Sequence, residues 1–102
     1  MATEKMFRDL ALSLPETEES SHMQHADFRV HGKIFATLPQ KGVGMVKLTP
    51  FEQEVLMKAE PDTFSPAAGA WGRAGCTLVK LSAITKPKLK DAMSAAWNNI
   101  KK

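Results

Sequence analysis

Cysteine is nearly absent from this chain, because its 102 residues contain only Cys76. One cysteine cannot form a disulfide within the chain, so packing has to supply the stability of the fold. A single thiol is also typical of proteins from a reducing compartment, which favours a cytoplasmic location.

Long apolar segments are missing as well. No stretch approaches the roughly 20 apolar residues that a helix needs to cross a bilayer. The first five residues, Met-Ala-Thr-Glu-Lys, contain neither the basic nor the apolar part of a secretion signal. We therefore expect a protein that is not secreted and has no membrane partner.

Sequence motifs of enzymes are absent too. The chain has no P-loop, no G-x-G-x-x-G loop and no G-x-S-x-G nucleophile turn. Cys76 precedes an apolar, strand-like segment, which favours a packed thiol over a nucleophile. The acidic residues Glu16, Glu18 and Glu19 fall in a predicted polar turn, where solvation explains them. We expect no catalytic residues.

The three histidines suggest a metal site only at first sight. His22 and His25 are three residues apart and lie close to Asp27 and His31. On one strand, side chains three positions apart point to opposite faces, so this pair would not converge on one ion. Histidines in turns or at the surface explain the same residues, and we expect no bound metal and no cofactor.

The composition that is present is typical of a globular domain. Hydrophobic residues make up 43% of the chain and charged residues 25%, as in folded rather than disordered proteins. A chain of this length forms one core rather than two. Because no linker, repeat or low-complexity segment interrupts the sequence, we predict a single domain over residues 1–102.

Local sequence features predict three helices. Apolar residues at helical spacing predict a helix over residues 3–13, which Pro15 ends. The sequence Thr-Pro-Phe-Glu at 49–52 is a capping box with proline at the first helical position, so a second helix begins there and ends before Pro61. An apolar stripe predicts the third over 86–100.

Short apolar runs between turn residues predict the strands. They cover residues 28–30, 33–38, 43–48, 64–70 and 76–81. Together with the helices they give the order α-β(3)-α-β(2)-α. This order indicates an α+β fold in which helices cover an antiparallel sheet.

The turn between the last two predicted strands combines an aromatic ring with a basic side chain. Trp71 and Arg73 lie close to Gly72 and Gly75. We predict that Trp71 packs in the core and that Arg73 is exposed. The alternative is that both contact a nucleic acid, by ring stacking and by a guanidinium contact.

Charge is distributed unevenly along the chain. Residues 73–102 carry seven basic residues against one acidic residue, Asp91, and are net +6, so the first 72 residues are net −3 in a chain of +3. Lys86, Lys88 and Lys90 crowd the start of the last predicted helix, where cations are disfavoured by about 0.3–1 kcal/mol each. A bound anion would reverse this penalty, whereas a merely solvated lysine-rich face is the alternative.

Three segments resemble the MmcQ/YjbR family. They are HADFRVHGKIFATL at 25–38, VKLTP at 46–50 and AWGRAGCT at 70–77. The resemblance implies an α-β(3)-α-β(2)-α domain, in a group that includes small secretion-chaperone-like folds. It also implies a double-wing DNA-binding protein and supplies no catalytic residues.

These observations predict a non-enzymatic DNA-binding protein of low sequence specificity. Its hairpin loops and the N-terminus of its last helix would contact phosphates. The predicted contact residues are Lys33, Lys41, Arg73, Lys86, Lys88 and Lys90.

Two other functions remain open. A protein partner, bound by an interaction or chaperone-like module, is favoured by six methionines, whose mobile thioethers suit adaptable apolar surfaces, although most are expected in the core. A small-molecule enzyme is the third hypothesis, which a deep pocket with convergent polar groups would favour.

Overall fold

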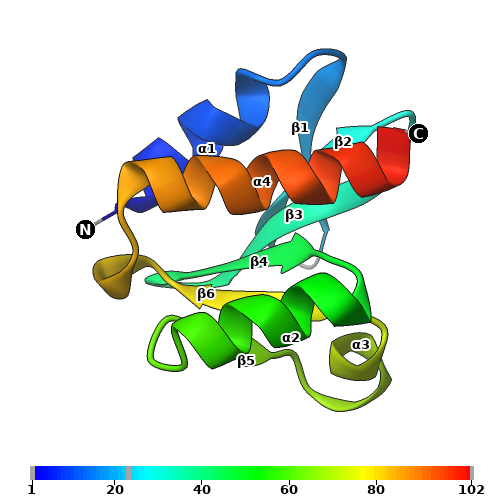
Figure 1. Ribbon diagram of the computed structural model, residues 1–102. Coiled ribbons are helices and arrows are strands. Elements are labelled where there is room, and N and C mark those ends of the chain that lie inside the picture. The colour runs from blue at the N-terminus through cyan, green and yellow to red at the C-terminus, as the bar shows by residue number, and fades with distance from the viewer. Residues whose placement is uncertain (1, 23, 102) are drawn as a thin grey trace.

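The chain forms a six-stranded antiparallel sheet with helices packed on it (Figure 1). This computed structural model describes residues 2–22 and 24–101. The sheet order is β1-β2-β3-β4-β6-β5, which confirms the predicted α+β class. The elements are α1 (Glu4–Leu12), β1 (Thr17–His22), β2 (His25–Val30), β3 (Lys33–Gln40), β4 (Val43–Lys47), α2 (Pro50–Ala59), β5 (Phe64–Pro66), α3 (Gly69–Arg73), β6 (Cys76–Lys80), the 3-10 turn η1 (Leu81–Ala83) and α4 (Lys86–Lys101).

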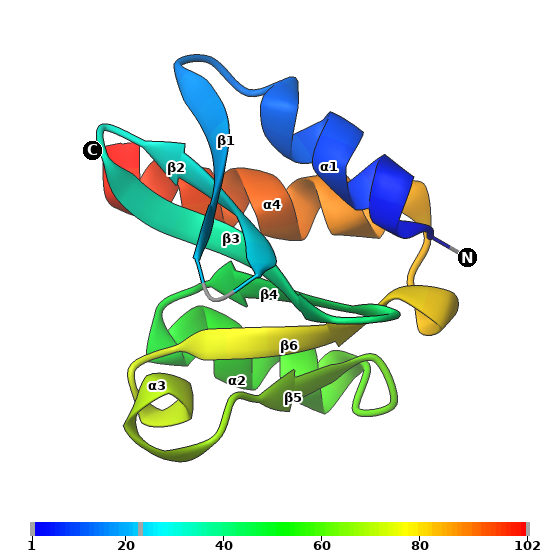
Figure 2. The same ribbon diagram turned by 180° about the vertical axis from the view of Figure 1, so that it is seen from behind.

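The three longer helices lie on one side of the sheet. In Figure 1, α4 and α2 are in front of the strands, and in Figure 2, seen from behind, the strands are in front of these two helices. Helix α1 packs on the same face, with the Phe7 ring against Gly44 of β4. Alternation along β4 follows this arrangement, because Gly44 and Val46 are buried whereas Met45 and Lys47 are half-buried. The sheet therefore has a helix-covered face and an open face.

The helix starts that the sequence predicts are present. The Thr3 side chain accepts a hydrogen bond from the Met6 amide and caps α1. At α2, the Thr49 side chain accepts from the Glu52 amide while the Glu52 carboxylate accepts from the Thr49 amide. This reciprocal capping box satisfies two backbone amides that the helix leaves free.

The core lies between the sheet and the helices α1 and α4. Phe7 of α1 is fully buried, and its ring centroid lies 5.9 Å from that of Phe28 on β2. A Cβ atom at Gly44 would come within 2.3 Å of the Phe7 ring. Glycine is thus needed at this position of β4 for α1 to pack closely on the sheet.

One strand was missed by the sequence prediction. The segment predicted as an acidic turn continues as β1, which pairs with β2 in the register Glu18 to Arg29 and Glu19 to Phe28. Its sequence, TEESSH, lacks the apolar alternation of a half-buried strand because β1 is an edge strand. Charged side chains are common at such edges, and Glu19 is paired with Arg8 of α1 at 3.0 Å.

Residues 64–75 also differ from the sequence prediction. The predicted strand 64–70 ends at Pro66, and after two residues without regular structure the short helix α3 takes up its last two positions and part of the predicted turn. Trp71 is 67% exposed, so the prediction that it packs in the core is wrong. Gly72 occupies the buried side of α3, where a Cβ would lie 1.9 Å from the Ala67 carbonyl oxygen, and Trp71 points outward instead.

The methionines are divided between the core and its margins. Met93 is buried, and Met6 and Met57 are half-buried against the core. Met45 is half-buried on the open face of β4. Met1 and Met23, also counted in the sequence prediction, lie outside the described residues.

Candidate functional site

A hollow of about 400 Å³ lies on the open face of the sheet. Ile34, Met45 and Leu78 contribute side chains from β3, β4 and β6, and Met45 is directly opposite Leu78 in the register. Ala67 and Trp71 border the hollow from the segment that contains α3. The site is mostly apolar and has an aromatic ring at its edge.

The Trp71 ring is both exposed and close to a cation. The Nζ atom of Lys47 lies 5.9 Å from the ring centroid, within the range of a cation–π interaction. Lys47 extends from the same open face of β4 as Met45 and lines the same hollow. The arrangement offers a flat aromatic surface next to a positive charge.

Cys76 at this hollow is not prepared for nucleophilic chemistry. The thiol is buried, as the sequence predicts. Burial raises the pKa of Cys76, and the nearby positive charge of Lys47 opposes this only in part. The thiol therefore stays protonated at neutral pH, whereas a nucleophilic cysteine needs a lowered pKa.

An ion pair between a buried carboxylate and a half-buried guanidinium lies next to the hollow on β2. The carboxylate of Asp27 accepts two hydrogen bonds from Arg29, at 2.8 Å from Nε and 3.1 Å from Nη2. The hydrogen bond to Asp27 raises the pKa of Arg29, so the guanidinium remains charged. Asp27 is opposite Thr37 of β3, which lines the hollow.

The basic residues predicted to bind DNA are divided between two ends of the sheet. Lys33 and Lys41 lie at the two ends of β3, about 26 Å apart at 3.3 Å per residue. Lys33 directly precedes Ile34, and Arg73 follows Trp71 by two residues on α3, so these two are close in sequence to residues of the hollow. Arg73 is exposed, as predicted.

The other predicted residues lie at the opposite end. The turn that contains Lys41 is joined to η1 by a hydrogen bond from the Leu81 amide to the Gly42 carbonyl. The three lysines of α4, Lys86, Lys88 and Lys90, follow η1 directly. Lys88 is already paired with Glu60, at 2.9 Å between Nζ and Oε1.

Lys47 is a residue of the candidate site that was not predicted, although the sequence pattern around it places its side chain. The segment Val43–Lys47 alternates small or apolar residues that face the helices with side chains that face the open side. Period-two alternation along this strand would have placed Lys47 beside Met45 on the open face. Its proximity to Trp71 was not predictable, because Trp71 itself was expected in the core.

His22 and His25 do not share one strand, although the sequence prediction assumed that they do. His22 and His25 are on two strands, and the β1–β2 pairing places their Cα atoms opposite each other rather than three positions apart on one strand. Among the side chains that the structure describes, which do not include that of His22, no group of three His, Cys, Asp or Glu has an arrangement that could hold a metal ion.

Candidate membrane-spanning helices were also sought among the described residues, and none of their helices has the length and apolar character needed to span a bilayer.

Comparisons with known proteins bear on the family and the fold. The family model YjbR matches residues 12–99. A crystal structure of a Deinococcus radiodurans protein with a DUF419 domain superposes with a TM-score of 0.85 at 19% sequence identity, and the match covers all of this chain and 80% of the other. No curated protein matches the chain significantly.

Proposed function

We propose a function for this chain, which belongs to the YjbR family. The proposed function is non-enzymatic binding of DNA with low sequence specificity. The contact surface is the open face of the sheet around Trp71, and single-stranded DNA is the preferred form.

The observation that carries this proposal is the exposed Trp71 ring beside Lys47. Unpaired bases stack on such rings with about 1–3 kcal/mol per base, and every base presents a π face, so stacking tolerates any sequence. Bases inside a duplex are already stacked and do not reach the ring. The geometry therefore favours single strands over duplexes.

Phosphate contacts complete the proposed surface. Lys47 on the open face and Arg73 on α3 supply positive charge close to Trp71, and Lys33 lies at the same end of the sheet, directly before Ile34. Lys41, Lys86 and Lys90 at the opposite end serve as further contacts for longer strands. We expect affinity to rise with oligonucleotide length and to fall steeply with salt, because each neutralised phosphate releases counterions.

Oligonucleotide titration tests the proposal. A labelled random-sequence single strand and the matching duplex are titrated by fluorescence anisotropy at several salt concentrations, with Trp71→Ala and Lys47→Glu as variants. We expect Trp71→Ala to weaken single-strand binding about 5- to 150-fold, which corresponds to one stacked base. Equal affinity of wild type and Trp71→Ala would contradict the proposed surface.

The chain offers a matched control for this titration. Phe51 is an aromatic residue that is 74% exposed on α2, on the helix-covered side of the sheet. We expect Phe51→Ala to bind single strands like the wild type. In a Trp97→Phe background Trp71 is the remaining tryptophan, and stacking should quench its fluorescence directly.

A protein-interaction role is the second candidate function. The observation that favours it is on the other side of the sheet, where Phe51 and Val55 of α2 expose apolar side chains.

A further inference from the structure

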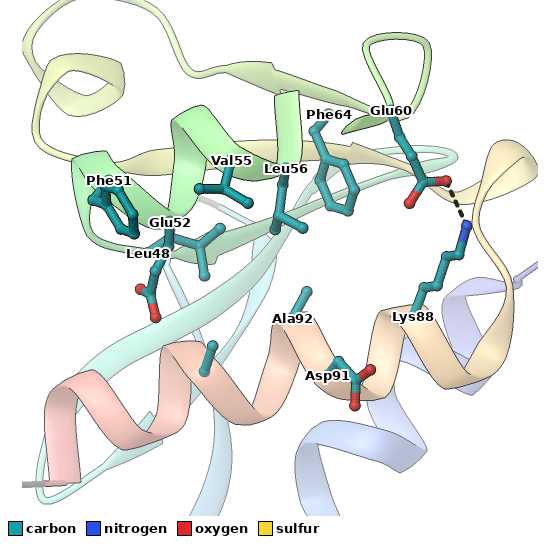
Figure 3. A pocket seen from close by; sticks show the side chains of 11 residues that line it. Leu48, Phe51, Glu52, Val55, Leu56, Glu60, Phe64, Lys88, Asp91 and Ala92 are labelled. Atoms are coloured by element: carbon teal, nitrogen blue, oxygen red, sulfur yellow. Dashed lines mark hydrogen bonds and ion pairs between the residues drawn. The ribbon is translucent and has the colours of Figure 1, made fainter. Parts of the chain in front are cut away.

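A second hollow separates α2 from α4 on the helix-covered face (Figure 3). It has a volume of about 280 Å³. Leu56 of α2, Phe64 of β5 and Ala92 of α4 line it, and Figure 3 shows the helices on either side with these side chains between them. The two helices thus bound an apolar groove.

Polar side chains bridge the groove toward both ends. At one end, Lys88 of α4 donates a hydrogen bond to Glu60 at the C-cap of α2, at 2.9 Å. At the other, the Asn99 side-chain amide donates to Glu52 in the first turn of α2, at 2.8 Å. The bridges hold α2 and α4 apart at a fixed spacing and leave the apolar middle open.

The α2 side of this groove exposes apolar surface to solvent. Phe51 is 74% exposed and Val55 is 49% exposed, and both line the groove. The buried side of α2 is held instead by Gln53, whose amide donates to oxygens of Gly72 on α3 and of Cys76 and Thr77 on β6. Burying a large apolar side chain contributes about 1.5–3 kcal/mol, so an occupant of the groove would gain substantially from these two residues.

The charge at the groove specifies the occupant further. The groove is lined by three carboxylates, of Glu52, Glu60 and Asp91, and by one ammonium group, of Lys88. The groove is thus acidic, although the chain as a whole has a net charge of +3. Asp91 is exposed and forms no ion pair with any residue that the structure describes. It is also the only acidic residue between positions 73 and 102. A positively charged group is the complementary partner for this position.

We propose that the groove between α2 and α4 binds a cationic amphipathic helix of a partner protein. Two or three of its apolar side chains enter between Phe51, Val55 and Leu56, and a lysine or arginine lies next to Asp91. Glu52 and Glu60, the α2 ends of the two bridges, are eight residues apart, or about 12 Å along a helix. This length accommodates apolar residues at i, i+3 or i+4, and i+7, as in other helix-in-groove complexes.

A pair of model peptides tests the charge and the shape of the occupant. One labelled peptide of roughly 14 residues has leucines on one helical face and lysines on the other, and its partner has glutamate in place of lysine. Binding to the full chain is followed by fluorescence anisotropy. We expect the leucine–lysine peptide to bind in the micromolar range and the leucine–glutamate peptide to bind at least about tenfold more weakly.

Variants place the binding on the groove. Val55→Glu and Asp91→Lys change exposed positions, so the fold should survive, and each should weaken the leucine–lysine peptide about tenfold or more. Asp9→Lys makes the same charge change on α1, and Trp71→Ala removes the aromatic ring of the open face; both should bind like the wild type. Unchanged affinity in both groove variants, or no binding by either peptide, would overturn the proposal. So would sedimentation showing a dimer that Val55→Glu dissociates, because the occupant would then be a second copy of this chain.

Discussion

The open face of the sheet and the groove between α2 and α4 lie on opposite sides of the same strands and differ in chemistry. The open face presents Trp71 beside Lys47, whereas the groove presents Phe51 and Val55 beside Asp91. The division does not follow the sequence halves. Lys47 comes from the acidic first 72 residues, and Asp91 comes from the basic remainder.

Net charge along the sequence is therefore a poor guide to the charge of a surface in the folded protein. Alternation along β4 places Lys47 on the open face, and the helical spacing of α4 places Asp91 at the groove. Two surfaces of opposite preference can therefore coexist on a small domain.

The largest loss of stability is expected for a change in the core, because the sheet carries both surfaces. Phe7 is fully buried between α1 and the sheet, and Phe7→Ala should lower the free energy of unfolding by about 3–5 kcal/mol through the cavity it leaves. Urea unfolding followed by circular dichroism measures this. Phe51→Ala, the same change at an exposed site, should stay within about 0.5 kcal/mol. Similar losses in both variants would mean that the burial of Phe7 does not support the fold as described.

A smaller loss of stability is expected for a change at Gln53, which holds the helix that carries Trp71. The buried Gln53 amide donates to the carbonyl oxygens of Gly72 and Cys76 and to Thr77 Oγ1. Gln53→Met leaves these acceptors without that donor and should cost about 1–3 kcal/mol. It should also weaken oligonucleotide binding, because Gly72 belongs to the helix that carries Trp71. The exposed Gln40→Met is the control, and a stability as high as the control's would contradict this role for Gln53.

The two surfaces can be separated by a crossed pair of variants. Trp71→Ala should lower oligonucleotide affinity about 5- to 150-fold and leave the affinity for the leucine–lysine peptide unchanged. Val55→Glu should do the reverse. Both ligands are titrated against both variants by anisotropy. If either variant weakens both ligands equally, the surfaces are not independent and the comparison fails.

The smallest effect concerns pH and a contact outside both surfaces. Glu16 accepts hydrogen bonds from Lys101 at 2.8 Å and from His31 at 2.7 Å, and these partners, Lys101 first, lower the pKa of Glu16. A carboxylate whose pKa is lower in the folded state adds stability above its unfolded pKa, about 4.3, and loses it as the pH falls through the folded value.

The free energy of unfolding of Glu16→Gln should therefore fall less than that of the wild type as the pH drops from neutral into the acid range. Urea midpoints of wild type and variant, measured across this range, should differ most at neutral pH and converge below pH 4. A constant difference at every pH would mean that the ionisation of Glu16 does not contribute.

The sequence predicted most of the fold because its local features were unambiguous. The capping box at Thr49 and Glu52 determined the start of α2, and the spacing of apolar residues determined α4. The edge strand β1 could not be predicted, because its alternation carries no apolar side chains. Of the candidate site, the exposure of Arg73 was predictable, whereas the pairing of Lys88 with Glu60, 28 residues away, depends on the packed fold.

The attachment of α4 to the start of the chain has a consequence during synthesis. Trp97 donates to the Pro15 carbonyl and Lys101 to Glu16, across 82 and 85 residues of sequence. At a ribosomal rate of about 5–20 residues per second, roughly 4 to 17 s pass between the synthesis of the two partners. During this interval the buried side of α1 and the helix-facing side of the strands lack α4 as their cover. A chain truncated before α4 should therefore be a substrate for chaperones and proteases, whereas the chain that includes α4 should escape both.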